Sequence, residues 1–248
     1  MTSLEICVDS VESALAAEAG GAQRIELCSS LIEGGLTPSL GLIREVRSRL
    51  TIGVHVLIRP RAGDFLYSEE ELAVMQQDIS LAKQAGANGV VFGLLTPEGG
   101  IDVERTRNLV ELARPMEVTF HRAIDQTRDI ASALEDVIRT GADRILTSGT
   151  APTAMQGRQS IRDLVLASNG RIRIMVAGTV RPENIQEIAH ATGALEFHAA
   201  LRRTIPSPMK HQSRNVHLGA PGVDDSVRRV VSSEDVRALQ QAIRTATR

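Results

Sequence analysis

Three short segments repeat one pattern: LEIC (residues 4–7), IELC (25–28) and LEFH (195–198). In each segment an apolar residue, a glutamate and a second apolar residue precede a cysteine or a histidine. Alternation of apolar and polar residues is typical of a β-strand with two different faces. If these segments are the first, second and last strands of a closed barrel, they lie side by side, with the glutamates, cysteines and histidine facing inward. Purely structural barrel interiors use Val, Ile and Leu, so the pattern indicates an interior with a chemical role.

The rest of the chain alternates in the same way between strand-like and helix-like segments. Strands are predicted near residues 4–8, 24–28, 53–59, 89–93, 117–122, 144–149, 171–178 and 196–201. Helices are predicted near residues 10–19, 38–49, 68–85, 102–113, 129–139, 158–168, 181–191 and 233–245. Eight such cycles predict an α/β protein, a single-domain (β/α)8 TIM barrel with a closed parallel sheet over residues 1–248. The alternative is an open, doubly wound sheet, but the repeated glutamate pattern favours closure.

Two further features bear on this architecture. A Gly-Ala pair precedes every even-numbered strand, at residues 21–22, 86–87, 141–142 and 193–194. A glycine just past a helix end is a common C-cap, so the repeat indicates a recurring unit. The connection at about 202–232 is longer than the others and polar, and we predict a long loop there that serves as a lid or a subunit contact.

Composition excludes several classes of protein. The 248 residues carry 28 basic and 30 acidic side chains, for a net charge of −2, so nothing marks the surface for nucleic acid or for an anionic membrane. No apolar run approaches the roughly 20 residues of a membrane span. The chain has two cysteines and no signal-like start, which favours a cytoplasmic protein with reduced thiols. No motif indicates an organic cofactor.

Assigning the apolar strand residues to the helix-facing side leaves an unusual set of inward residues. That set is Glu5, Cys7, Asp9, Arg24, Glu26, Cys28, His55, Arg59, Arg61, Thr119, His121, Arg144, Glu196 and His198. Buried charges must be paired, hydrated or ligated. For the residues near the strand starts, the favoured interpretation is an ion network in which Arg24 and Arg144 neutralise Glu5, Glu26 and Glu196.

The strand ends predict a different kind of site. Arg59 and Arg61 follow the third strand, and His121 and Arg122 follow the fifth. Arginine clusters suit carboxylate or phosphate recognition, because the planar guanidinium binds two oxygens at once. Gly178 ends the seventh strand before a helix, a place where barrels often bind phosphate. Arg122 has outward parity, so a structural role is an equal alternative for it.

The segments LEICVDS, RIELC, EGGLTPSLG, IRPRAGDFLYS, TFHRAID and RILTSG resemble those of the CutC family, called copper homeostasis proteins. The resemblance runs from Leu4 to about Gly219. It implies a cytosolic, homo-oligomeric TIM barrel with a role in copper handling. It also implies that Cys7 and Cys28 are Cu(I) ligands.

Two hypotheses for the function remain open. In the first, the barrel binds copper(I) through Cys7 and Cys28, with His198 as a third ligand, because soft thiolates select Cu(I); inert packing of the two cysteines is the alternative.

In the second hypothesis, the barrel is an enzyme that acts on a small anionic metabolite. Arg59, Arg61, Arg122 and Gly178 bind the anion, His121 or His55 is the general acid or base, and Glu26 orients it or pairs with Arg24. A Schiff-base aldolase is disfavoured, because the two lysines, Lys83 and Lys210, do not end strands. The residues do not identify the reaction.

Overall fold

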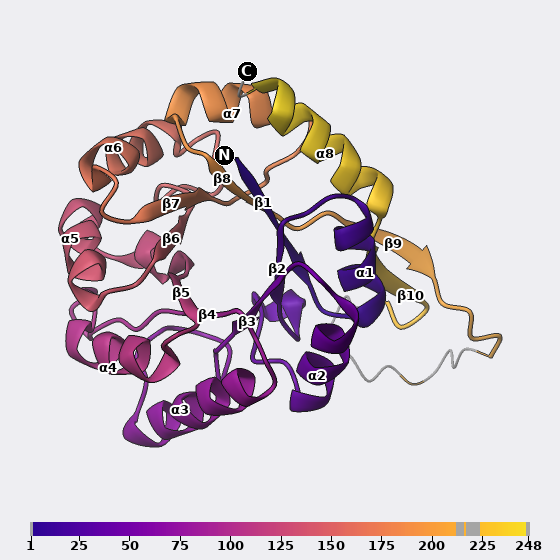
Figure 1. The fold of residues 1–248 in the computed structure, drawn as a ribbon, viewed down its shortest axis with the longest axis horizontal. Helices are drawn as coiled ribbons and strands as arrows, with labels where there is room; N and C mark the ends of the chain where they lie inside the picture. The colour runs from indigo at the N-terminus through magenta and orange to yellow at the C-terminus, as the bar shows by residue number, and fades with distance from the viewer. Residues whose placement is uncertain (1, 212–215, 217–223, 247–248) are drawn as a thin grey trace.

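The computed structural model describes residues 2–211, 216 and 224–246, and it shows a closed barrel of parallel strands ringed by helices (Figure 1). The barrel strands are β1 (Ser3–Val8), β2 (Arg24–Leu27), β3 (Gly53–Leu57), β4 (Gly89–Phe92), β5 (Glu117–Phe120), β6 (Arg144–Thr147), β7 (Arg173–Val176) and β8 (Glu196–Ala199). The helices are α1 (Val11–Ala19), α2 (Leu40–Arg49), α3 (Glu69–Gln84), α4 (Val103–Ala113), α5 (Ile130–Thr140), α6 (Arg158–Ser168), α7 (Ile185–Thr192) and α8 (Ser233–Ala246). The predicted TIM barrel is confirmed.

The register of β1 brings the three repeated segments together. Cys7 on β1 is the pairing partner of Glu26 on β2, and Glu5 is the partner of Arg24 on β2 and of His198 on β8. The last strand therefore pairs with the first, and this closure excludes the open sheet.

Alternation along the strands separates two environments. Leu4, Ile6 and Val8 are fully buried against the helices. The interior contains charged groups and two small apolar clusters, one of which includes Val91 and the other Met175. On the uniformly apolar strands β4 and β7, these two residues face inward, so the structure assigns the orientation that apolar runs alone leave undefined.

The Gly-Ala repeat has the predicted conformational role. The four glycines, Gly21, Gly86, Gly141 and Gly193, all have positive φ angles between 70° and 94°. Gly141 and Gly193 are the C-caps of α5 and α7. A left-handed turn at each of these positions ends the helix and sends the chain into the next strand.

The connection predicted as a loop at 202–232 contains regular structure at both ends, which corrects that prediction. Strands β9 (Arg202–Pro206) and β10 (Val227–Val231) pair antiparallel, and they lie beside α1 outside the barrel ring (Figure 1). The Val231 N–H donates to Ser13 Oγ of α1, a contact that local sequence does not show. Residues 212–215 and 217–223 of the expected loop lie outside the described residues.

Two more observations complete the fold. The helix expected from residue 181 begins at Ile185, because Arg181 N–H donates to the Asn184 side chain in a preceding turn. No helix in the described ranges is both long and apolar enough to cross a membrane.

Candidate metal centre and ligand pocket

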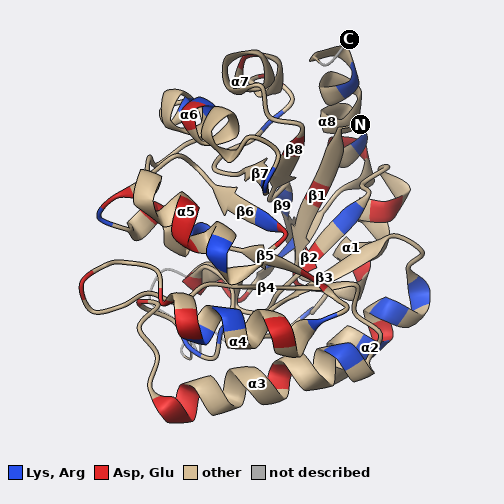
Figure 2. Ribbon diagram, turned by 60° about the vertical axis from the view of Figure 1, so that its left-hand side comes forward, with Lys and Arg blue, Asp and Glu red and all other residues tan. Residues whose placement is uncertain are grey.

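The first layer of the site is an ion network at the start of the strands. Arg24 pairs with Glu5 and Glu196, and Arg144 pairs with Glu196 and Glu117. Figure 2 shows acidic and basic segments on the barrel strands as well as on the outer helices. The predicted network is thus present for Glu5 and Glu196.

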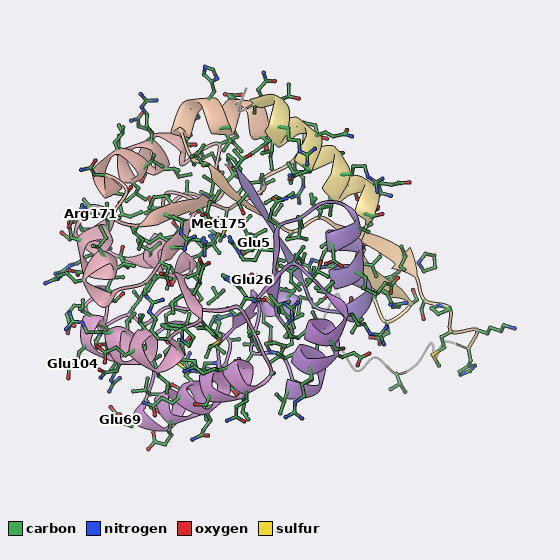
Figure 3. The ribbon with its side chains drawn as sticks, viewed as in Figure 1. Glu5, Glu26, Glu69, Glu104, Arg171 and Met175 are labelled. Atoms are coloured by element: carbon green, nitrogen blue, oxygen red, sulfur yellow. The ribbon has the colours of Figure 1, made fainter. Side chains whose placement is uncertain are left out.

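Glu26 does not belong to this network, which corrects the expected pairing with Arg24. Arg24 pairs with Glu5 and Glu196. Glu26 lies beside Cys7 in the register of β1 and β2, one layer higher, with its Oε2 3.9 Å from His198 Nε2. Figure 3 shows Glu5 and Glu26 toward the middle of the barrel, whereas Glu69, Glu104 and Arg171 lie on the outside.

A thiol, carboxyl and imidazole cluster forms this second layer. The Cys7 and Cys28 sulfurs are 3.8 Å apart, and Cys28 Sγ lies 3.5 Å from Glu26 Oε2. One ligand atom from each of Cys7, Glu26 and His198 lies within 4.8 Å of the others. The structure therefore joins the three predicted metal ligands to Glu26, which the sequence suggested only as a catalytic group.

The surroundings of the two cysteines and of His198 shift their pKa values in different directions. A hydrogen bond from Cys28, with contributions from His198, outweighs burial and lowers the pKa of Cys7 to about 5. Burial raises the pKa of Cys28 well above its usual range. Burial opposes the charge of His198, but hydrogen bonds with Cys7 and Glu5 raise its pKa above the usual value. At neutral pH the cluster accordingly holds a Cys7 thiolate beside a His198 imidazolium.

Glu26 has the opposite character. Burial and the nearby Cys7 charge raise the pKa of Glu26 to about 8, so its carboxyl group is protonated at neutral pH. In this state it donates a proton or a hydrogen bond.

The donor set fits a soft metal ion. The two sulfurs are 3.8 Å apart, which is within reach of one ion because a metal–thiolate bond is about 2.3 Å long. His198 Nδ1 bonds to Glu5 Oε1 at 2.7 Å, so Nε2 is the ring nitrogen left to bind an ion. A carboxylate on the second ring nitrogen is the usual support for a metal-binding histidine.

A pocket of about 460 Å³ opens above the cluster, at the C-terminal ends of the strands. Its floor includes Cys7, Glu26 and His198, and its wall includes Arg59, Phe65, His121, Arg122 and Asp125. The metal-type cluster and the predicted anion-binding residues thus share one cavity.

His121 lies in this wall but is held as a neutral imidazole. It caps the 3₁₀ helix η2 (Arg122–Gln126), and its Nδ1 accepts from Ala123 N–H at 3.2 Å. Burial and the Arg59 charge lower the pKa of His121 to about 3. The imidazole is therefore neutral at pH 7, because it is desolvated beside a cation.

His55 is not brought to the pocket. It lies in the lower layer, with Nε2 3.7 Å from Glu117 Oε2, and burial lowers its pKa to about 3. Its contact with Glu117, from the middle of β3, places it with the ion network rather than with His121.

The predicted anion-binding residues separate into two groups. Arg59 and Arg122 line the pocket. Arg61 instead pairs with Glu71 and Asp64 outside it. Gly178 is covered by the segment after β6, since its carbonyl accepts from Ala154 N–H and an added Cβ would lie 3.0 Å from Ser148 Cβ.

Sequence reasoning missed Asp125 and Phe65. Asp125 accepts from the N–H groups of Ser148 and Thr150 and pairs with Arg122, so it positions the rim of the pocket. Both residues occur in segments that carry the family resemblance, IRPRAGDFLYS and TFHRAID. Their position after strand ends was the available signal.

Comparison with known proteins identifies the family. The CutC family model matches residues 2–203. The chain belongs to the CutC family. A CutC protein of Chromobacterium violaceum is 48% identical over 97% of each chain. The mouse copper homeostasis protein cutC homolog is 50% identical over 88% of this chain and 80% of its own length.

A solved CutC structure has the same architecture. The Streptococcus agalactiae protein is 34% identical, with a TM-score of 0.76 over 80% of this chain and 98% of its own. Phosphoribosylanthranilate isomerase from Pyrococcus furiosus, at 13% identity and a TM-score of 0.59, shares the fold alone. The family resemblance and the barrel inferred from sequence are both confirmed.

Proposed function

We propose that this CutC-family protein binds Cu(I) in the barrel, with Cys7 and Cys28 as thiolate ligands and His198 as the third. The observation that carries the proposal is the 3.8 Å separation of the two sulfurs, of which that of Cys7 lies on the floor of an open pocket. Thiolate ligands select Cu(I) over harder ions, and the relatives named for copper homeostasis support this choice of metal.

The protein groups around the sulfurs have defined roles in this proposal. Cys7 already carries the negative charge that a metal ligand needs, whereas Cys28 and His198 Nε2 each lose a proton when the ion binds. Glu5 holds the His198 ring through Nδ1. Reduced thiols are required, which agrees with the cytoplasmic location expected from sequence.

A Cu(I) titration against a competing chelator tests the proposal. We expect Cys7→Ser and Cys28→Ser each to weaken Cu(I) binding at least tenfold, and the double variant to abolish competition, because a hydroxyl is a poor ligand for a soft ion. The control Met75→Leu removes a buried sulfur in α3 that does not line the pocket, and it should leave the affinity unchanged. Parent affinity in the double variant would reject the site.

A second candidate function is catalysis on a small anionic metabolite. It is favoured by the pocket at the strand ends, where TIM-barrel enzymes carry their active sites, and by Arg59 and His121 in its wall. In this function His121 acts as a neutral hydrogen-bond donor, and the protonated Glu26 is the group able to donate a proton.

A further inference from the structure

Arg59 is a buried cation that is held by backbone carbonyl groups. Its side chain is 6% exposed, and in the described ranges no carboxylate lies within ion-pair distance of it. Its Nη atoms instead donate to the backbone carbonyls of Glu33, Gly35 and Gly63. By contrast, Arg61 and Arg122 both have carboxylate partners. An unneutralised buried charge destabilises a folded protein. Of these three arginines, Arg59 is therefore the one best placed to bind an anion from solution.

Two buried N–H groups, one of Arg59 itself and one of the neighbouring His121, are available to donate hydrogen bonds. Arg59 Nε and His121 Nε2 are buried, and among the described residues neither has a partner with good hydrogen-bond geometry, although the Tyr67 hydroxyl lies close to the Arg59 side chain. Because His121 Nδ1 accepts from Ala123 N–H and the ring is neutral, the imidazole proton lies on Nε2. Both atoms are therefore N–H donors, and unsatisfied buried donors are rare in folded proteins.

The ring of Phe65 lies against both residues. Its centroid is 4.8 Å from that of the His121 ring and 5.2 Å from Arg59 Cζ. Phe65 is only partly buried and lines the pocket. Its carbonyl accepts from Leu95 N–H at 2.9 Å, so the backbone is anchored and rotation of the side chain is the available movement.

We propose that Arg59 and His121 bind the oxyanion of a small carboxylate- or phosphate-bearing ligand, and that the Phe65 side chain gates this site. Rotation of the ring opens the site to the pocket. The two N–H groups then donate to the oxyanion, whose charge neutralises Arg59. This inference deepens the second candidate function, because it names the ligand class that the same pocket would bind. It does not depend on copper binding.

Calorimetric titration of inorganic phosphate and of acetate into Phe65→Ala tests the gate. A closed gate lowers apparent affinity by the fraction of open molecules. We therefore expect Phe65→Ala to bind at least one of the two anions about tenfold more tightly than the parent chain. The preferred anion identifies the ligand as a phosphate or a carboxylate. Parent affinity in Phe65→Ala for both anions would overturn the gate.

Second substitutions in Phe65→Ala test the two donors. Adding His121→Asn removes Nε2 but keeps an acceptor for Ala123 N–H, and we expect at least a tenfold loss of anion affinity. The matched control adds Arg61→Gln, a neighbouring arginine whose partners lie outside the pocket, and retains the affinity of Phe65→Ala. Equal affinity with and without His121 would overturn the site.

Two measurements make the result independent of variant folding and of catalysis. In the parent chain, phosphate or acetate at saturating concentration should shift the ¹⁵N resonance of His121 Nε2, and the absence of a shift with both would contradict the proposal. A metabolite screen that finds no turnover, with anion binding intact, would reject the enzyme hypothesis and leave this site in place. Cu(I) affinity should be equal in Phe65→Ala and the parent.

Discussion

At the scale of the residue, the barrel interior holds two histidines as neutral rings and one as a cation. Glu5 and Cys7 hold the charge of His198, whereas His55 and His121 are buried near arginines. The same residue type thus has opposite protonation states within one barrel. The difference follows from which charges each ring faces.

This difference predicts a pH dependence of stability. The pKa of His121 falls from 6.5 to about 3 on folding, so below pH 6.5 the unfolded chain binds a proton that the folded chain does not. Its stabilising contribution is complete above pH 6.5 and is lost as the pH falls toward 3, by at most about 1.4 kcal/mol per pH unit. Urea unfolding of His121→Asn between pH 7.5 and 5 should show a weaker loss of stability than the parent.

The exposed His190 on α7 provides the comparison. His190→Asn should keep the pH dependence of the parent, because this side chain meets solvent before and after unfolding. A parent-like pH profile in His121→Asn would mean that the pKa of His121 is the same in the folded and the unfolded protein, which contradicts the argument.

At the scale of the element, α1 and α8 pack together where the two ends of the chain complete the helical ring (Figure 1). Gly20 ends α1, and a Cβ added there would lie 2.4 Å from Val236 Cβ of α8. The close approach of the two helices therefore depends on the absence of a side chain at this residue.

Replacing this glycine should separate the helices. We expect Gly20→Ala to lower the free energy of unfolding by about 1–3 kcal/mol, the usual cost of overpacking. Gly41→Ala in α2, where the nearest atom is 3.9 Å from the added Cβ, should instead raise it by about 0.5 kcal/mol. Urea denaturation measures both, and equal stability of the two variants would contradict the packing argument.

At the scale of the whole molecule, the ion network ties together strands from both halves of the chain. Arg144 on β6 is fully buried and pairs with Glu117 of β5 and Glu196 of β8. Arg24 on β2 also pairs with Glu196. These contacts cross the barrel interior at the end opposite to the pocket, so this layer supports the site without entering it.

Loss of the central arginine should destabilise the whole barrel. Arg144→Met removes the fully buried partner of Glu196, whose side chain is only 12% exposed, and we expect the free energy of unfolding to fall by about 3 kcal/mol. Arg171→Met removes an exposed ion pair with Glu135 and should have little effect, since surface pairs contribute little. Similar urea midpoints for both variants would show that the interior network does not stabilise the fold.

The sequence by itself determined the barrel and the contents of its interior. Strand alternation and the glycines at helix ends act over a few residues, so residues 4–7, 25–28 and 195–198 predicted both closure and the gathering of Cys7, Cys28 and His198. The two-stranded β9–β10 sheet escaped prediction because its contact with α1 joins residues far apart in the chain.

Only the tertiary structure decided which partner each long polar side chain takes. Arg59 and Arg61 are two residues apart and equally suited to an anion, yet one lies unpaired in the pocket and the other pairs with Glu71. Glu26 lies beside Cys28 and His198 and does not pair with Arg24. A long side chain pairs with whichever acceptor folding brings within reach, and burial then sets its protonation state; neither the distance nor the burial is encoded in a local pattern of residues.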